Sequence, residues 1–212
     1  MSPPPNALPP VAIAAAWAAA WADAGLPGQG LDLRDALWAA YAQPQRRYHT
    51  QQHLSECLGL WEALRPQAQR PGEVGLALWF HDAVYEVKAG DNELRSADWA
   101  RQALLAAGAE AAVAQRVHAL VMATCHAAPT ATPDEALLVD IDLAILGADA
   151  ARFAEYERQV RDEYGWVPGF LYRRKRREVM RGFAQRAPLY QTAVVRARLE
   201  APARLNLQPY SG

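Results

Sequence analysis

The imidazole and carboxylate side chains that most suggest chemistry stand at three places in the chain. They are His49 and His53 in RRYHTQQH, His81 and Asp82 in WFHDAVYE, and Asp140 and Asp142 in VDIDLAILG. An ionisable pair beside the aromatic residues of WFHD is costly to bury unless its charge is compensated. A divalent transition metal accepts both ligand types, and its charge compensates buried carboxylates. The pattern therefore predicts a site for such an ion, with Mn²⁺, Fe²⁺, Co²⁺, Ni²⁺ and Zn²⁺ all compatible.

Each motif taken alone has a simpler interpretation. The HxxxH spacing places His49 and His53 on one helical face, but it lacks the glutamate of zinc proteases. A His-Asp pair also caps or ends helices, and Asp140 or Asp142 could begin one. These two aspartates lie about 200° apart around a helix, so both can hardly face one ion. The order of the motifs along the chain, rather than any one of them, favours a metal site.

Helical periodicity dominates the segments that must position these groups. Alanine and leucine are frequent, and runs of alternating β-branched residues are absent. The predicted helices cover residues 11–25, 33–43, 45–65, 73–80, 92–108, 109–127, 148–165, 168–186 and 188–204. In the first of them, Trp17 and Trp21 form a buried stripe. The sequence therefore predicts an all-α bundle, with a disordered or extended segment at 1–10 and a single helical domain over 11–212.

Charge and composition disfavour several classes of protein. The 212 residues carry a formal net charge of −1, so the charge balance favours neither nucleic acid nor an acidic membrane. No Lys or Arg precedes Arg34, and the apolar stretch at 11–22 is too short to span a membrane. Two cysteines are too few for a disulfide framework and fit a reducing compartment. We expect a cytoplasmic protein with no membrane partner, and the oligomeric state stays open.

The basic run YRRKRR at 172–177 is the feature that most suggests nucleic acid. A helical stripe of Val179, Met180 and Phe183 continues through it. Acidic residues at 155, 157, 162 and 163 precede it and can pair with its charges. We therefore interpret the run as a solvated or ion-paired helix face, which disfavours a nucleic-acid partner. Arg176 could instead reach a phosphate in the cleft.

Five blocks together resemble a known family. They are R-x-Y-H-x-x-x-H at 46–53, W-F-H-D-x-V-Y at 79–85, D-N-E-x-x-S-A at 91–97, D-I-D-L-A-I-L-G at 140–147 and A-R-L-N-L at 203–207. In this order they resemble the HD-domain superfamily of metal-dependent phosphohydrolases, and more closely one bacterial subgroup of predicted phosphohydrolases. The resemblance implies an HD-domain-like helical bundle in which His49, His81, Asp82 and Asp142 hold the metal. Asp142 is preferred to Asp140 because the family's last aspartate usually precedes a stretch like LAILG.

Residues beside these ligands become candidates for the reaction itself. The catalytic candidates are His53, Glu93 and His126, and the substrate-binding candidates are Arg46 and Asn92. A guanidinium such as that of Arg46 can grip a phosphate through two hydrogen bonds. His53 could equally be a hydrogen-bonded core histidine, and the polar cluster at 91–93 could simply cap a helix. His118 is more typical of a structural histidine.

We expect metal-assisted hydrolysis of a small phosphate ester, with a nucleotide or related metabolite as substrate. The ion would lower the pKa of a bound water and hold a phosphoryl oxygen, while an imidazole or acid assists proton transfer. Two alternatives stay open: a non-catalytic nucleotide-binding helical module, and a di-iron oxygenase of the same superfamily, which needs more ligands. The sequence does not separate monoesterase from diesterase or pyrophosphohydrolase activity.

Overall fold

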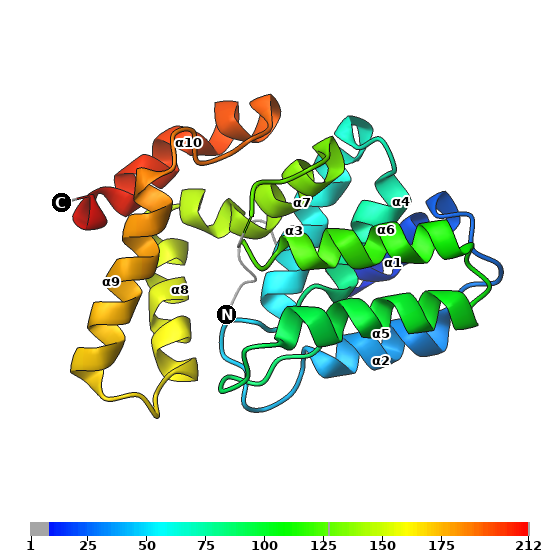
Figure 1. The fold of residues 1–212 in the computed structure, drawn as a ribbon, viewed down its shortest axis with the longest axis horizontal. Helices are drawn as coiled ribbons and strands as arrows, with labels where there is room; N and C mark the ends of the chain where they lie inside the picture. The colour runs from blue at the N-terminus through cyan, green and yellow to red at the C-terminus, as the bar shows by residue number, and fades with distance from the viewer. Residues whose placement is uncertain (1–8, 127, 212) are drawn as a thin grey trace. The chain divides into compact units, whose positions relative to one another are not determined.

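The computed structural model describes residues 9–126 and 128–211, and all regular secondary structure in these ranges is helical (Figure 1). This confirms the all-α prediction, whereas the HD-domain-like arrangement stays a prediction. Within the same ranges, no helix combines the length and the apolar character needed to cross a bilayer. Residues 1–8 of the segment predicted to be disordered or extended lie outside the described residues, and Pro10 already begins the first helix.

Two compact units divide the chain, one ending at Val139 and the other beginning at Asp140. The prediction of a single domain over 11–212 stays a prediction. The first unit contains α1 (Pro10–Asp23), α2 (Leu31–Ala40), α3 (Gln51–Leu64), the 3-10 helix η1 (Arg65–Gln67), α4 (Pro71–Phe80), α5 (Asn92–Ala106), α6 (Ala111–Ala123) and most of α7 (Pro133–Asp142). The second unit contains the end of α7, the 3-10 helix η2 (Leu143–Gly147), α8 (Ala150–Glu163), α9 (Gly169–Gln185), α10 (Ala193–Leu207) and the 3-10 helix η3 (Gln208–Tyr210).

Helix α4 is the core of the first unit. Each residue from Gly72 to Phe80 is buried, because the segment is apolar around its whole circumference apart from Glu73. Gly75 allows a close approach of α3, since a Cβ at this position would lie 2.6 Å from the ring of Trp61. Each large apolar side chain buried here contributes about 1.5–3 kcal/mol to stability. The helix that ends just before His81 and Asp82 is therefore packed against other parts of the chain around its whole circumference.

Helix α1 packs against α4 through its tryptophans. Trp17 stands edge-on to Trp79 with ring centroids 5.2 Å apart, and it stacks on Trp21 at 5.1 Å. The two indole N–H groups of α1 donate to the carbonyl oxygens of Gln29 and Pro27, at 2.8 Å and 3.0 Å. Trp17 and Trp21 are only 1% and 3% exposed, which confirms the predicted buried stripe.

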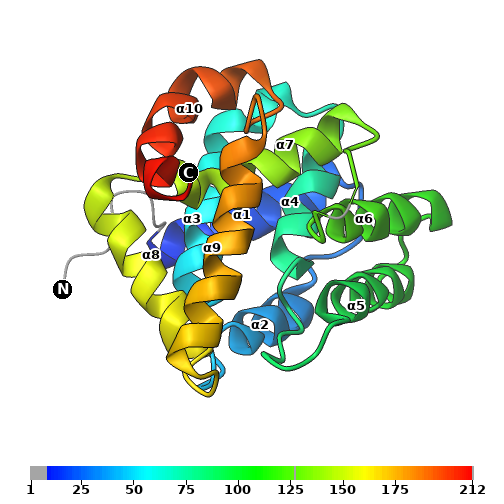
Figure 2. The ribbon, with the colours of Figure 1, turned by 60° about the vertical axis from the view of Figure 1, so that its left-hand side comes forward.

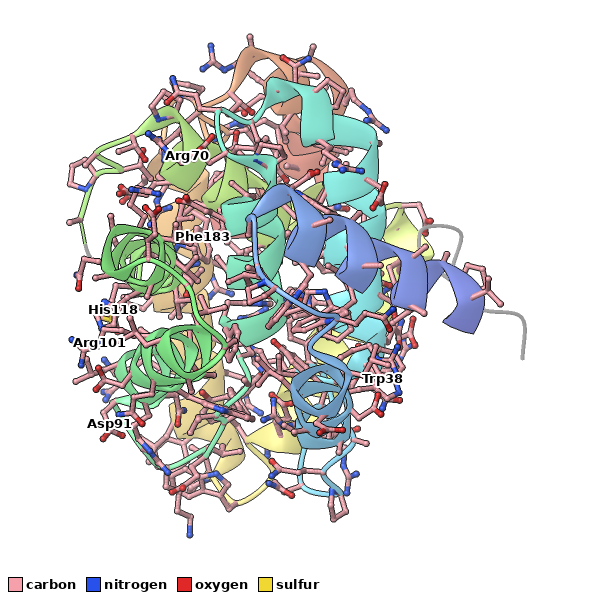
Figure 3. The ribbon with its side chains drawn as sticks, turned by 90° about the vertical axis from the view of Figure 1, so that its right-hand side faces the viewer. Trp38, Arg70, Asp91, Arg101, His118 and Phe183 are labelled. Carbon is pink, nitrogen blue, oxygen red and sulfur yellow. The ribbon has the colours of Figure 1, made fainter. Side chains whose placement is uncertain are left out.

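Helices α5 and α6 lie side by side, and Figure 3 looks along both of them. The Asp98 carboxylate of α5 accepts a hydrogen bond from Arg101 at 3.0 Å and lies 3.4 Å from Nε2 of His118 on α6. This pairing supports the interpretation of His118 as a structural histidine. Arg116 of α6 donates two hydrogen bonds, of 2.7 Å and 2.6 Å, to the buried Glu73 carboxylate. The bidentate pair joins α6 to α4.

In the second unit, α8 and α9 lie side by side (Figure 2). Arg176 of α9 donates from Nε and from a terminal nitrogen to Oε1 of Glu157 on α8, at 3.1 Å and 2.5 Å. Its guanidinium also lies 4.8 Å from the ring centroid of Tyr156. The interpretation of the basic run as an ion-paired helix face is confirmed for Arg176. Its alternative role in binding phosphate stays a prediction.

The Glu200 carboxylate of α10 holds the segment before that helix. It accepts hydrogen bonds from the backbone N–H groups of Leu189 and Tyr190, both at 3.1 Å, and from Arg204 at 2.9 Å. Burial opposes ionisation, but these donors lower the pKa of Glu200 below its ordinary value. The carboxylate therefore stabilises this unit in its ionised form.

Candidate metal centre

Helix α3 begins later than predicted, and this separates two histidines. Thr50 caps the helix, and its hydroxyl accepts a hydrogen bond from the backbone N–H of Gln52 at 3.3 Å. His53 lies in the first turn and is buried, whereas His49 lies in the turn before the helix. The predictions of a helix over 45–65 and of both imidazoles on one helical face are therefore wrong.

The His-Asp pair follows the last residue of α4. The Nδ1 atom of His81 lies 2.7 Å from the carbonyl oxygen of Leu78. Because a carbonyl can only accept, Nδ1 carries the proton and Nε2 presents its lone pair. The hydroxyl of Tyr41 accepts a hydrogen bond from the backbone N–H of Asp82 at 3.2 Å. The end of α4 thus fixes both the orientation and the tautomer of the His81 ring.

Three potential ligand atoms converge beside this ring. Nε2 of His81 lies 3.0 Å from Nε2 of His53 and 3.1 Å from Oδ2 of Asp82, and the His53 and Asp82 atoms are 3.6 Å apart. Two ligands held about 2.1 Å from one ion lie about 3.0 Å apart at 90° and about 3.4 Å apart at the tetrahedral angle. The observed distances fit one divalent ion. The His81 lone pair and the Asp82 carboxylate repel each other unless a proton or a metal ion lies between them.

The charge state of the Asp82 carboxyl fits a role as a ligand. Burial alone would raise its pKa, but the imidazoles of His81, His49 and His53, when they are protonated, hold that pKa well below the ordinary range. The group therefore stays ionised near neutral pH. Its side chain is 16% exposed, against 3% and 1% for the side chains of His53 and His81. The carboxylate is the part of the cluster that solvent reaches most easily.

Arg46 holds the turn that carries His81 and Asp82 through hydrogen bonds to the backbone. This buried guanidinium donates to the backbone carbonyl oxygens of Asp82 at 2.6 Å, Ala83 at 2.8 Å and His49 at 3.1 Å. It also lies 5.2 Å from the ring centroid of Tyr41. These contacts give Arg46 a positioning role, because they fix the peptide that carries Asp82. Its predicted role in substrate binding stays a prediction.

His49, predicted as a ligand, lies at the edge of the cluster. Its ring stacks on Tyr85 with centroids 4.1 Å apart, and its centroid is 6.1 Å from that of His53. The imidazole still contributes to the low pKa of Asp82. Its assignment as a ligand stays a prediction, and the structure instead brings His53, a catalytic candidate, against His81.

Cys57 is a member of the cluster that sequence reasoning did not assign to it. It stands one helical turn after His53 on α3, and its Sγ lies 3.8 Å from both nitrogens of the His53 ring. The potential ligand atoms of His53, Cys57 and His81 all lie within 4.8 Å of one another. The spacing H-x-x-x-C within a helix was the signal that could have found it.

Three other candidates lie on α5 and after α6. Asn92 binds the backbone of Glu86 twice, accepting from its N–H and donating to its carbonyl oxygen, each at 3.0 Å. Glu93 stands in the first turn of α5 and contributes, after burial, to a raised pKa of Cys125. His126 has a positive φ of 52°, which is uncommon outside glycine. The roles predicted for Asn92, Glu93 and His126 stay predictions.

The two aspartates of VDIDLAILG lie at the end of α7 and differ in their surroundings. Asp140 is fully buried and accepts hydrogen bonds from the backbone N–H groups of Gln191 and Thr192, at 2.9 Å and 2.7 Å, and from the Thr192 hydroxyl at 2.6 Å. It therefore holds the start of α10. Asp142 is the last residue of α7. The choice of Asp142 as the ligand stays a prediction, and the contacts of Asp140 give that residue a structural role.

Comparison with known proteins found no family model, curated protein or solved structure that matches this chain. The fold and the site therefore define a broad class: a helical protein with a buried group of side chains that could hold a metal ion. The resemblance to the HD-domain superfamily stays a prediction.

Proposed function

We propose that the protein is a metal-dependent phosphohydrolase that acts on a small phosphate ester, with a nucleotide or related metabolite as its expected substrate. The convergence of His53, His81 and Asp82 supports this proposal most strongly, because three ligand atoms from two helix ends lie 3.0–3.6 Å apart. Two imidazoles and a carboxylate suit a divalent transition metal better than Mg²⁺. Neither Cys57 nor Cys125 forms a disulfide, which fits the reducing cytoplasm in which we place the protein.

A divalent ion bound in this cluster supplies a Lewis acid and a water of lowered pKa. The residues of the chain prepare the site for it. His81 offers its lone pair in a fixed tautomer because Nδ1 donates to the Leu78 carbonyl oxygen. Asp82 stays ionised near neutral pH because the charge of the surrounding imidazoles, when they are protonated, lowers its pKa. Arg46 holds the Asp82 peptide, so the carboxylate does not have to be ordered when the ion binds.

A cavity next to the His-Asp turn is where we place the organic part of the substrate. It has a volume of about 540 Å³, and Ala83, the residue after Asp82, is one of the residues that line it. Side chains from three elements line it, among them Ala39 of α2, Tyr85 of the turn, and Trp99 of α5. Small-molecule sites commonly measure about 300–1,000 Å³, and they combine apolar walls with a few polar groups. The size and the lining suit a ligand as large as a nucleotide.

The test is phosphate release by the full-length protein after metal removal and reloading with Mn²⁺, Co²⁺ or Zn²⁺. The panel contains nucleoside mono-, di- and triphosphates, cyclic nucleotides and generic phosphate esters. The Asp82→Asn variant should lose about 10- to 100-fold or more in activity and in metal affinity. Asp98→Asn is the matched control, because Asp98 pairs with Arg101 and His118 on another helix pair.

Equal phosphate release by wild-type protein and Asp82→Asn would remove the assignment of the site. Nucleotide binding without turnover in every metal form would favour the non-catalytic module. Turnover that depends on oxygen and on iron would favour the oxygenase.

A further inference from the structure

We propose that the cavity next to the His-Asp turn is a nucleobase site, in which the indole of Trp99 stacks on the base and the amides of Gln43 and Gln45 bind its edge. This inference rests on the proposed function and deepens it, because it narrows the substrate from a small phosphate ester to a nucleoside phosphate. The composition of the cavity carries it: an indole, an apolar helix face and two amides line a volume of about 540 Å³.

Trp99 offers the cavity an aromatic surface that the core does not cover completely. It lies in α5, and its ring stands at 84° to that of the buried Phe80, with centroids 5.8 Å apart. This contact orients the indole, while the side chain stays half-buried and lines the cavity. Aromatic side chains stack on nucleobases with little dependence on sequence, because every base has a π face. The indole is therefore suited to a planar base.

The face of α2 that lines the cavity is apolar and has little bulk. Ala36, Ala39 and Ala40 all line the cavity, and their spacing places them on one side of the helix. None of them has side-chain atoms beyond Cβ to fill the space. A flat ring can lie against such a face, whereas a larger side chain at Ala39 would occupy part of the volume.

Two glutamine amides add polar groups to the lining. Gln43 Oε1 accepts hydrogen bonds from Arg46 Nε at 3.3 Å and from Gln45 Nε2 at 3.0 Å. Among the described residues, no group binds the amide nitrogen of Gln43 or the amide oxygen of Gln45. One donor and one acceptor are therefore left for a ligand. Nucleobase edges carry donors and acceptors next to each other, and glutamine amides pair with them.

The turn that lines the cavity is fixed before a ligand enters. Ser96 of α5 accepts a hydrogen bond from the backbone N–H of Val84 at 3.0 Å. Asn92 of the same helix accepts one from the backbone N–H of Glu86, also at 3.0 Å. Both Val84 and Glu86 line the cavity. A site that is already formed loses less entropy when it binds a ligand.

Tyr85 links the cavity to the candidate metal centre. It lines the cavity, and its ring stacks on that of His49 with centroids 4.1 Å apart. The His49 ring in turn lies 6.1 Å from that of His53, a member of the ligand cluster. A nucleotide has the same order of parts, since a pentose separates its base from its phosphate. We therefore place the base in the cavity and the phosphate at the ion.

Equilibrium dialysis of the metal-free, full-length protein with adenosine, guanosine, cytidine and uridine tests the nucleobase site. Nucleosides carry no phosphate, so their binding does not depend on the metal centre. We expect at least one of them to bind, whereas ribose, which has no base, should not. Trp99→Ala should weaken nucleoside binding about 5- to 100-fold, the usual loss for a stacked base, and Trp99→Phe, which keeps an aromatic face, by less than about fivefold.

Two further variants separate stacking from an effect on folding. Ala39→Leu keeps a high helical propensity at an exposed position but fills the cavity, so nucleoside binding should be lost. Trp166→Ala is the matched control, because it removes a tryptophan that is 55% exposed in the loop between α8 and α9, and it should leave nucleoside binding unchanged. If Trp99→Ala does not fold, Ala39→Leu decides.

The outcomes distinguish the nucleobase site from the proposed hydrolase. No binding of any nucleoside at about 10 mM overturns the nucleobase site, as does binding of wild-type strength in Trp99→Ala or Ala39→Leu. Neither result affects the proposed hydrolase, which is judged by Asp82-dependent phosphate release from generic esters. Nucleoside binding that Trp99→Ala weakens, without any Asp82-dependent phosphate release, removes the proposed hydrolase and keeps the nucleobase site.

Discussion

Arg46→Lys tests whether a buried guanidinium holds the His-Asp turn. The side chain donates four hydrogen bonds, to Gln43 Oε1 and to the carbonyl oxygens of His49, Asp82 and Ala83. Lysine keeps the charge but places it at a single point, and its ammonium group cannot reproduce the planar fork. We expect the variant to lose at least two of these bonds and to leave a buried carbonyl without a donor.

The size of the effect follows from the strength of such bonds. A hydrogen bond to a charged group contributes about 1.5–3 kcal/mol, so the loss of two costs about 3–6 kcal/mol. The retained ammonium charge and any entering water offset part of this, which leaves about 2–4 kcal/mol. With a urea dependence of about 2 kcal/mol per molar, the unfolding midpoint should fall by about 1–2 M.

Urea denaturation followed by circular dichroism measures this shift, and the neighbouring arginine provides the control. Arg47 is exposed and donates to the carbonyl oxygen of Pro44 at 2.8 Å. Arg47→Lys should therefore change the free energy of unfolding by less than about 0.5 kcal/mol. Similar midpoints for the two variants would refute the assigned role of Arg46. Cobalt affinity measured on folded Arg46→Lys should also fall, since the Asp82 peptide is no longer fixed.

Three further predictions concern packing, pH and metal binding. Gly75→Ala should lower the free energy of unfolding in urea by about 1–3 kcal/mol, because the new Cβ meets the ring of Trp61. Gly182→Ala is the control: its Cβ meets no atom within 4 Å, so the variant should be neutral or more stable by up to about 1 kcal/mol. Glu200→Gln should destabilise the protein at pH 7. Because the pKa of the folded carboxylate is lowered, its contribution to stability is present above the unfolded pKa and is lost as the pH falls through the folded pKa. A difference in unfolding free energy between variant and wild type that does not shrink in acid would contradict this. Cobalt at about 100 times its dissociation constant should add about 2.7 kcal/mol of stability, seen as a higher melting temperature that EDTA reverses, and Asp82→Asn should abolish the shift.

The helices were predictable because local sequence determines them. The apolar segment GEVGLALWF predicted a buried helix ahead of the His-Asp pair, and α4 has that burial. Trp17 and Trp21, four residues apart, marked the face of α1 that packs inward. The acidic residues before the basic run predicted an ion-paired face, and Arg176 is paired in this way. In each case the interaction partners lie on the same helix face or on neighbouring helices.

The start of α3 was not predictable from local pattern. The segment QRRYHT contains no glycine or proline, so helical propensity continues through it. Arg46 instead reaches carbonyl oxygens 36 and 37 residues further along the chain, and Thr50 begins a new helix. Contacts at such a separation leave no periodic signal in the sequence. For this reason the sequence predicted a shared face for His49 and His53 that the structure does not have.

The composition of the candidate site was only partly predictable. His81 and Asp82 were identified because an ionisable pair interrupts an apolar run. Cys57 was not assigned to the site, since a lone buried cysteine is common in protein cores. Its distance from His53 depends on the rotamers of both side chains, and spacing alone does not specify them.

The complete enclosure of α4 has a consequence for the timing of its motions. Backbone amides on a helix with one solvated side exchange their hydrogens during small local openings, but α4 offers no such side between Gly72 and Phe80. Its amides should exchange only when most of the first unit opens, which makes them the slowest in that unit. The imidazole and carboxylate that follow this helix therefore keep their relative position during local fluctuations of the surrounding helices. They lose it only when the first unit unfolds as a whole.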